Sequence, residues 1–281
     1  MRARWLPLLA CALAASAAFA QQQVEVPSLD RRNGEPLALI GHWFAAAGDA
    51  TRPAIVLLHG CGGAYDARGR LSQRLVEYSA LFNEQGWHAL VLDSLKSRGV
   101  RELCTQATGG RAITMTHRRL DALGALQWLA ARPDVDARRL ALVGWSNGGS
   151  TVLAASNALQ RDVAAASVKP RAAVAFYPGC AAESSRGFRS TAPLLLMSGA
   201  SDDWTPAGPC VTLAAHSGHT VRSIVYPDAY HGFDGTVAPR LRRDVPNGVN
   251  PGKGVTVGGQ PAAREASRTE LLAHLHGQLD R

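Results

Sequence analysis

Short apolar runs alternate along the chain with segments in which apolar residues return every three or four positions. The runs occupy residues 54–58, 89–92, 140–143, 172–176, 194–197 and 224–225. Nearly continuous apolar runs are typical of strands that are buried on both faces of a parallel sheet. Helical spacing is clearest in two stripes, formed by Leu71, Leu75, Tyr78 and Phe82 and by Leu120, Leu123, Leu126 and Ala130. The pattern predicts an α/β fold, with a mostly parallel central sheet and helices on both faces.

Three further segments complete the expected organisation. Residues 37–44 predict a leading strand at the edge of the sheet, and residues 261–280 predict a C-terminal helix. Residues 235–259 are rich in glycine, proline, asparagine and valine, which predicts a long loop. A loop of this length either borders a functional pocket or is an excursion at the surface.

The first twenty residues have the pattern of a secretory signal peptide. Arg2 and Arg4 precede an apolar stretch, and Ala18-Phe19-Ala20 resembles an Ala-x-Ala cleavage site. We expect cleavage after Ala20 and a periplasmic or secreted protein. The apolar stretch is too short to span a bilayer comfortably, so we expect no membrane association after cleavage. A bacterial lipoprotein signal that ends at Cys11 is an alternative interpretation.

The remaining residues, 21–281, are expected to form a single domain, because a chain of this length with 46% hydrophobic residues can bury one substantial core. The net charge is +8, or 28 − 22 = +6 without Arg2 and Arg4. The basic residues are spread along the sequence, with small clusters at 118–119, 138–139 and 240–243. A nucleic-acid-binding protein would concentrate them in a stripe with aromatic platforms. We therefore expect a solvated basic surface and no nucleic-acid partner.

A serine framed by glycines follows the apolar run at 140–143. In the segment Gly144-Trp-Ser146-Asn-Gly148, the glycines remove side chains that would collide in a sharp strand-to-helix turn. Such a turn would place Ser146 at the carboxyl end of a strand, where its hydroxyl can act as a nucleophile. The alternative is an ordinary turn whose serine caps the following helix.

An acid and a histidine follow in the order that a serine nucleophile of this kind requires. The run at 194–197 leads into Asp202 and Asp203, and the strand at 221–226 leads into a loop that contains His231. Serine is a poor nucleophile until an imidazole accepts its proton, and a carboxylate orients that imidazole. We assign these roles to His231 and Asp202, with Asp203 as the competing acid.

The loop after the first apolar run is a candidate for stabilising an oxyanion. The sequence His59-Gly-Cys61-Gly-Gly63 follows residues 54–58. One amide from this loop and one from the residue after the nucleophile are the expected donors, namely those of Cys61 and Asn147. A phosphate-binding loop is disfavoured, because the glycine and lysine spacing of such loops is absent.

Taken together, these motifs resemble the dienelactone hydrolase family. The resemblance is carried by His-Gly-Cys-Gly-Gly at 59–63, Gly-Trp-Ser-Asn-Gly-Gly at 144–149, Ser-Gly-Ala-Ser-Asp-Asp-Trp-Thr-Pro at 198–206 and Tyr-His-Gly-Phe at 230–233. It extends from about residue 35 to the C-terminus and implies the α/β-hydrolase fold. Dienelactone hydrolases proper use a cysteine nucleophile where this chain has Ser146, so the resemblance implies general serine esterase chemistry.

Export would allow the cysteines to form disulfides. Without Cys11 the chain has four cysteines, which allow three pairings. We favour Cys61 with Cys104 and Cys180 with Cys210, because each pair would join neighbouring loops at the carboxyl edge of the sheet.

Aromatic residues flank the motifs, and these are Tyr65, Trp145, Trp204 and Phe233. They could line an apolar substrate pocket or could pack the catalytic loops. No separate lid segment is evident, which favours small soluble esters or lactones over long-chain lipids.

We expect no metal and no cofactor. The motif His-Glu-x-x-His is absent, and His216-Ser-Gly-His219 lacks a third ligand. The same nucleophile, base and acid also serve serine peptidases. A peptidase acting on short peptides is therefore one alternative, and a non-catalytic binding protein on the same scaffold is another.

Overall fold

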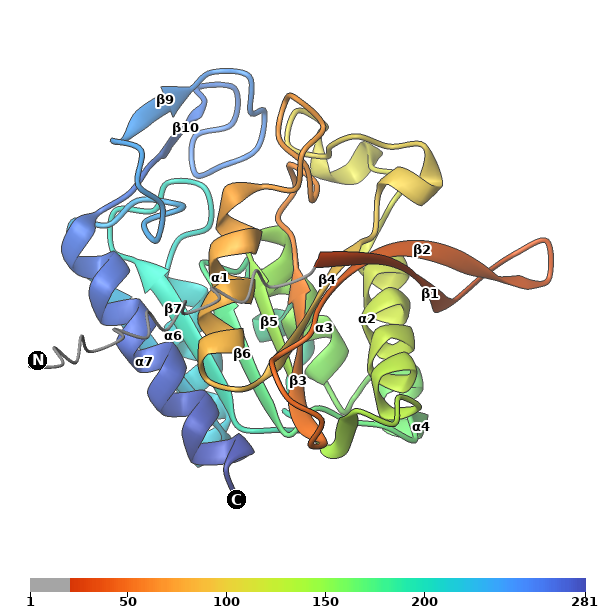
Figure 1. The fold of residues 1–281 in the computed structure, drawn as a ribbon. Coiled ribbons are helices and arrows are strands. Elements are labelled where there is room, and N and C mark those ends of the chain that lie inside the picture. Colours follow the sequence, from red (N-terminus) through yellow and green to blue (C-terminus); the bar gives the residue numbers. More distant parts are fainter. Residues whose placement is uncertain (1–20) are drawn as a thin grey trace, which may run out of the picture.

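The computed structural model describes residues 21–281, and the signal segment predicted at 1–20 lies outside this range. Eight strands form the central sheet: β1 (Gln21–Arg32), β2 (Glu35–Phe44), β3 (Arg52–Leu58), β4 (His88–Asp93), β5 (Val135–Trp145), β6 (Ala172–Phe176), β7 (Leu194–Gly199) and β8 (Val221–Tyr226). Their order across the sheet is β1-β2-β4-β3-β5-β6-β7-β8 (Figure 1). β2 pairs antiparallel with both neighbours, and every pairing from β4 to β8 is parallel. The predicted mostly parallel sheet is confirmed.

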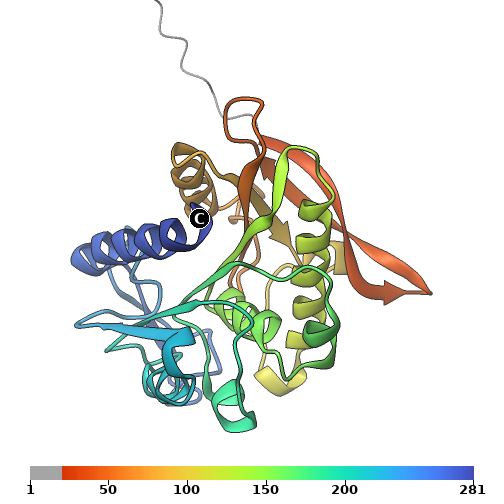
Figure 2. The same cartoon turned by 90° about the horizontal axis from the view of Figure 1, so that it is seen from below.

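Helices cover both faces of this sheet (Figure 2). One face packs against α1 (Gln73–Glu84) and α7 (Pro261–Leu279), and the other against α2 (Met115–Ala130), α3 (Asn147–Ser156) and α6 (Gly208–His216). Successive strand residues point to opposite faces, so Ile55 and Leu57 join the first core while Ala54, Val56 and Leu58 join the second. Because both faces are buried, the strands require the continuous apolar runs seen in the sequence.

Shorter elements lie in the connections. They are α4 (Arg161–Ala165), α5 (Ala181–Arg186), η1 (Lys96–Arg98), η2 (Thr108–Gly110), η3 (Gly218–Thr220), β9 (Arg240–Arg242) and β10 (Val255–Val257). β9 and β10 form a two-stranded antiparallel sheet within the segment predicted as a long loop. In Figure 1 this excursion, residues 235–259, lies above the carboxyl ends of the central strands.

Among residues 21–281, no helix combines the length and the apolar character needed to cross a membrane.

The edge of the sheet differs from the prediction. The strand predicted at 37–44 is β2, and β1 lies outside it as the edge strand.

The strand order creates a crevice at one edge of the sheet. β3 lies between β4 and β5 in the sheet. The chain therefore places β4 on one side of β3 and then crosses over to place β5 on the other side. The loops after β3 and β5 therefore diverge, and such a switch point in an open α/β sheet is where ligands bind. The parallel strands β5, β7 and β8 end at this same edge and deliver the predicted catalytic residues to it.

Candidate active site

Ser146 occupies a strained turn directly after β5. Its backbone angles are φ 55° and ψ −118°, a region that residues with a side chain rarely adopt. The two glycines around it permit this turn, since a Cβ at Gly148 would lie 1.9 Å from the carbonyl oxygen of Leu58 and one at Gly144 would lie 2.3 Å from that of Gly148. The sharp turn exposes the Ser146 hydroxyl at the sheet edge.

His231 and Asp202 form a continuous hydrogen-bonded chain with Ser146. Nε2 of His231 lies 2.8 Å from Oγ of Ser146, and Nδ1 lies 2.8 Å from Oδ2 of Asp202. A carboxylate can only accept, so Nδ1 carries the proton and Nε2 is free to accept the one from the serine hydroxyl. The structure thus brings together three residues that are widely separated in the sequence.

Asp202 is held by several donors. Its Oδ1 accepts the backbone N–H groups of Trp204 and Thr205, each at 2.8 Å, and the Thr205 hydroxyl lies 3.0 Å from Oδ2. Burial alone would raise the pKa of this carboxyl, but the neighbouring His231 and the two amides outweigh burial and hold the pKa below its ordinary value. Asp202 is therefore an ionised, oriented partner for the imidazole.

Asp203, the competing acid, faces the other way. Its carboxylate accepts the backbone N–H of Thr256 at 2.8 Å and lies 3.1 Å from the Thr256 hydroxyl. Its backbone carbonyl also accepts the N–H of Val249 at 2.9 Å. Asp203 thus ties the excursion to the loop after β7, while its neighbour contacts the imidazole.

The predicted oxyanion donors lie in two ordered segments. The Nδ1–H of His59 donates to the Gly60 carbonyl at 2.7 Å, and its Nε2 accepts the N–H of Ser94 at 3.2 Å. Burial, reinforced by the charge of Arg118, lowers the pKa of His59 to about 3, which keeps the ring neutral. Because the peptide bond is planar and trans, fixing the Gly60 carbonyl also fixes the direction of the Cys61 N–H.

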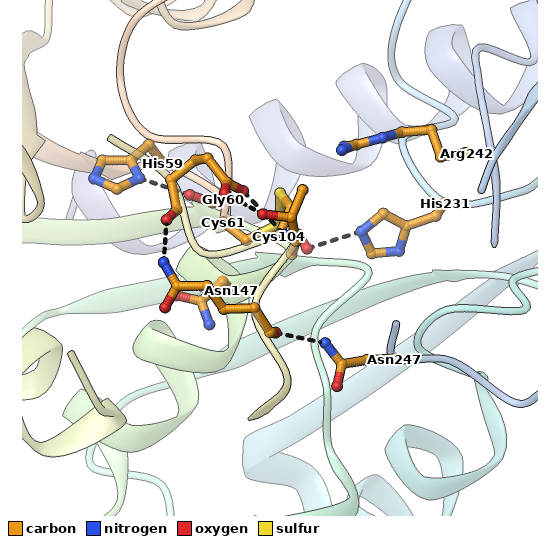
Figure 3. The surroundings of a disulfide bond; sticks show 12 residues. His59, Gly60, Cys61, Cys104, Asn147, His231, Arg242 and Asn247 are labelled. Atoms are coloured by element: carbon orange, nitrogen blue, oxygen red, sulfur yellow. Dashed lines mark hydrogen bonds between the residues drawn. A yellow bond between two sulfur atoms is a disulfide. The ribbon is translucent and has the colours of Figure 1, made fainter. Parts of the chain in front are cut away.

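The second predicted donor is the amide of Asn147. Asn147 is the first residue of α3, so this amide has no carbonyl one turn earlier to bind. Figure 3 shows Asn147 close to His59, Gly60 and Cys61, with His231 approaching from the other side of the disulfide.

Both predicted disulfides are present, Cys61–Cys104 and Cys180–Cys210. The first ties the loop after β3 to the segment after β4, where the N–H of Leu103 also donates to the Cys61 carbonyl at 2.7 Å. The second joins α5 to α6. One bridge therefore braces the loop of the predicted oxyanion donor, and the other lies farther along the same edge.

Ser146 lies between two cavities. The larger, of about 410 Å³, is lined by His231 and by the arginines Arg74, Arg240, Arg242 and Arg264. The second, of about 370 Å³, is lined by the apolar side chains of Ile113, Met115 and Trp204, by uncharged polar groups and by Arg111, without a contribution from His231. Cys61, Ser146 and Trp204 line both cavities, so Ser146 faces a cavity on each side.

The predicted aromatic pocket is formed only in part. Trp145 and Trp204 line the larger cavity, and the ring centroid of Trp204 lies 4.6 Å from that of His231. Phe233 is fully buried in the core against Tyr177 and Tyr226, and Tyr65 lines neither cavity that contains Ser146. These two residues pack beneath or beside the loops, which is the second of the two roles that the sequence leaves open for the flanking aromatic residues.

Several residues at the site were not predicted. Tyr177 contacts His231 with a centroid separation of 4.6 Å, and its hydroxyl donates to the buried Asp234 at 2.7 Å. Asp234 also accepts the indole N–H of Trp145 at 3.0 Å and thereby links the histidine loop to the residue before the nucleophile. The one signal in the sequence for this role of Asp234 is its position three residues after His231.

The predicted basic surface also needs a correction. Arg118 is fully buried, whereas its neighbour Arg119 is partly exposed and pairs with Asp162. Arg118 lies on the face of α2 that points to the loops of the site, so it is not part of a solvated cluster.

Within residues 21–281, no group of three or more histidine, cysteine, aspartate or glutamate side chains could hold a metal ion.

The sheet, with a serine, an acid and a histidine converging at its carboxyl edge, defines the protein as an α/β-hydrolase. A model of the dienelactone hydrolase family matches residues 42–250, and the chain belongs to this family. No curated protein matches the sequence.

Solved structures share the fold at low sequence identity. A dienelactone hydrolase-like promiscuous phosphotriesterase from metagenomic libraries has a TM-score of 0.64 and 19% identity, over 92% of this chain and 99% of the other. Esterase 2 of Thermogutta terrifontis has a TM-score of 0.62 and 15% identity, over 91% and 93%. A puromycin-hydrolysing peptidase of Mycobacterium tuberculosis has a TM-score of 0.60 and 17% identity, over 95% of this chain and 41% of the peptidase.

Proposed function

We propose that this protein is an exported serine hydrolase that cleaves small carboxylic esters or lactones through an acyl-enzyme intermediate. The observation that carries the proposal is the hydrogen-bonded chain from Ser146 through His231 to Asp202, with 2.8 Å at each link. Membership of the dienelactone hydrolase family supports hydrolysis of a small molecule.

The proposed reaction has two halves. Oγ of Ser146 attacks the carbonyl carbon while its proton passes to Nε2 of His231, and Asp202 stabilises the resulting imidazolium. The amides of Cys61 and Asn147 hold the oxyanion. When the bond to the leaving alcohol breaks, the proton passes from Nε2 to the alcohol oxygen. A water molecule then attacks the acyl-enzyme by the same route, and the acid is released.

The two cavities suggest how an ester would lie. His231 must reach the leaving oxygen to protonate it, and only the larger cavity is lined by His231. The alcohol part is therefore assigned to the larger cavity and the acyl part to the smaller one. Arginines line the alcohol side, and three of them are paired within the protein: Arg74 with Asp234, Arg242 with Asp244 and Arg264 with Glu77.

Export is supported by the two disulfides, because such bonds persist in oxidising compartments and are rare in the cytosol. The predicted signal peptide agrees with a periplasmic or secreted location. Mass spectrometry of the protein from its host would locate its first residue, which we expect to be Gln21.

Covalent labelling with a fluorophosphonate tests the proposal directly. We expect one label on Ser146 and loss of labelling in Ser146→Ala, whose kcat on a nitrophenyl ester should fall on the order of 10⁶-fold. Ser185→Ala, which alters an exposed serine on α5, is the matched control and should label normally. Labelling of Ser146→Ala at the wild-type rate, or no labelling of the wild type, would refute a serine hydrolase and support a non-catalytic scaffold.

A matched ester and anilide with the same acyl group separate an esterase from a peptidase. We expect rapid hydrolysis of the ester and a much slower reaction of the anilide. In a series of nitrophenyl esters, kcat/KM should be highest for short acyl chains, because the sequence shows no separate lid segment that would enclose a long chain. A maximum at long chains would contradict the proposed substrate class.

A further inference from the structure

Arg118 is a fully buried cation whose hydrogen bonds go to neutral oxygens. It lies on α2, and its side chain has no exposed surface. One terminal nitrogen donates to the His59 carbonyl at 2.8 Å, and the other donates to Oδ1 of Asn147 at 2.5 Å. Burying a charge is costly, so a cation retained in this position needs a reason in the chemistry around it.

The two acceptors belong to the two segments that carry the predicted oxyanion donors. The His59 carbonyl lies two residues before Cys61, in the loop after β3, and the His59 ring in turn holds the Gly60 carbonyl. Asn147 directly follows Ser146, and it carries both the Oδ1 atom that accepts from Arg118 and the backbone N–H that is the predicted oxyanion donor. One planar guanidinium therefore connects two segments that lie 88 positions apart, as 147 − 59 = 88.

We propose that Arg118 is a positioning residue for the oxyanion hole, where it holds the amides of Cys61 and Asn147 at the separation that a tetrahedral intermediate requires. The inference rests on the proposed function.

The physical reason is geometric. Oxyanion donors act when they lie within about 2.7–3.1 Å of the developing charge, so a small shift between the two segments weakens both bonds. The fork of an arginine has fixed N–H directions, whereas a lysine ammonium on a flexible stem cannot span both acceptors in the same way. Arg118 is held as a cation by the nearby carboxylates of Asp121 and Asp93. Burial lowers its pKa to about 10, so it stays charged at neutral pH.

Three variants test the positioning role. Arg118→Lys keeps the charge and loses the fork, Arg118→Met removes both bonds, and Asn147→Ala removes one acceptor while keeping the backbone amide. Arg119→Lys is the matched control, because Arg119 is the next residue on α2 and is paired with Asp162 at 2.8 Å. Asp162 lies outside both segments that carry the predicted oxyanion donors.

The readouts are kcat and KM on nitrophenyl butyrate and the inhibition constant of a trifluoromethyl ketone, which forms a serine-bound oxyanion. For Arg118→Lys and Asn147→Ala we expect kcat to fall about 10-fold or more while KM changes less than about 2-fold. The inhibition constant should rise by the same factor as kcat falls. In Arg119→Lys, kcat and the inhibition constant should stay near their wild-type values, whatever the loss in Tm.

The outcomes separate this inference from the proposed function. If the wild type neither labels with fluorophosphonate nor hydrolyses esters, the proposed function fails. If the wild type is active but Arg118→Lys and Asn147→Ala leave the inhibition constant unchanged, or behave as Arg119→Lys does, the inference alone is overturned. If Arg118→Met does not fold, the two milder variants still decide the question.

Discussion

At the scale of single residues, Asp202 and Asp203 show how adjacent carboxylates acquire separate roles. Both follow the same strand, but one contacts the imidazole of His231 and the other holds Thr256 on the excursion. The two residues lie in the turn after β7, where the Asp202 carboxylate accepts the N–H groups of Trp204 and Thr205, and their side chains diverge within this turn.

The two acids provide a matched pair of substitutions. Asp202→Asn keeps the shape of the side chain but removes the negative charge that orients and stabilises the imidazolium, so kcat should fall by about 10⁴-fold. Asp203→Asn should reduce kcat far less, because this carboxylate does not contact His231. Nitrophenyl ester kinetics on both variants would check this, and a larger loss of kcat in Asp203→Asn would reverse the assignment of the acid.

Other features of the site follow less directly from the sequence. The glycines around Ser146 have a steric signature that can be recognised without coordinates. Arg118 has none, because a helical arginine is ordinarily exposed and only tertiary packing buries this one. For Phe233 the sequence leaves two roles open, lining the pocket or packing the catalytic loop, and only the tertiary structure shows that its ring is buried in the core.

At the scale of the element, continuous apolar runs predicted the buried strands well. β1 was not predicted, because its residues are mostly polar and exposed at the edge of the sheet. β9 and β10 have three residues each, too few for a period to be recognised. Apolar runs thus predict the buried strands and also β8 at the other edge of the sheet, but they miss the polar β1 and the three-residue β9 and β10.

The two disulfides should differ in their effect on the reaction. Each closes a loop of similar size, with sequence separations of 43 and 30, so removal of either should cost about 4 kcal/mol of unfolding free energy. Replacing Cys61 and Cys104 by alanine should also lower kcat, because the loop with the predicted Cys61 donor loses its tie. The Cys180/Cys210 pair is the control for stability. Urea unfolding and ester kinetics on both double variants would check this, and equal kcat values would contradict it.

At the scale of the whole molecule, buried histidines couple folding to pH. Burial is the largest cause that lowers the pKa of His42, His59, His88 and His274. The depressed pKa of Asp202 acts in the same direction, while the raised pKa of Asp93 opposes it. Below about pH 6.5 these histidines therefore bind protons in the unfolded chain but stay neutral in the folded protein.

The free energy of unfolding should consequently fall as the pH drops from about 6.5. For His59 this pH range extends down to its folded-state pKa of about 3. Within the range, the one proton that only the unfolded chain binds changes the free energy of unfolding by about 1.4 kcal/mol per pH unit. Urea unfolding at several pH values between neutrality and pH 4 measures this slope. His59→Asn should have a slope shallower by about one proton, and identical slopes in the two proteins would exclude the coupling.

The exposed edge of the sheet has a consequence for association. β1 ends the sheet on one side, and open strand edges can recruit another chain and grow into aggregates. The register of β1 against β2 shifts between Pro27 and Arg31, which interrupts the regular row of backbone donors and acceptors. Asp30, Arg31 and Arg32 then add charge to the same stretch. A second molecule that approaches this side meets an irregular, charged rim, so the longest strand of the fold is a poor template for fibril growth.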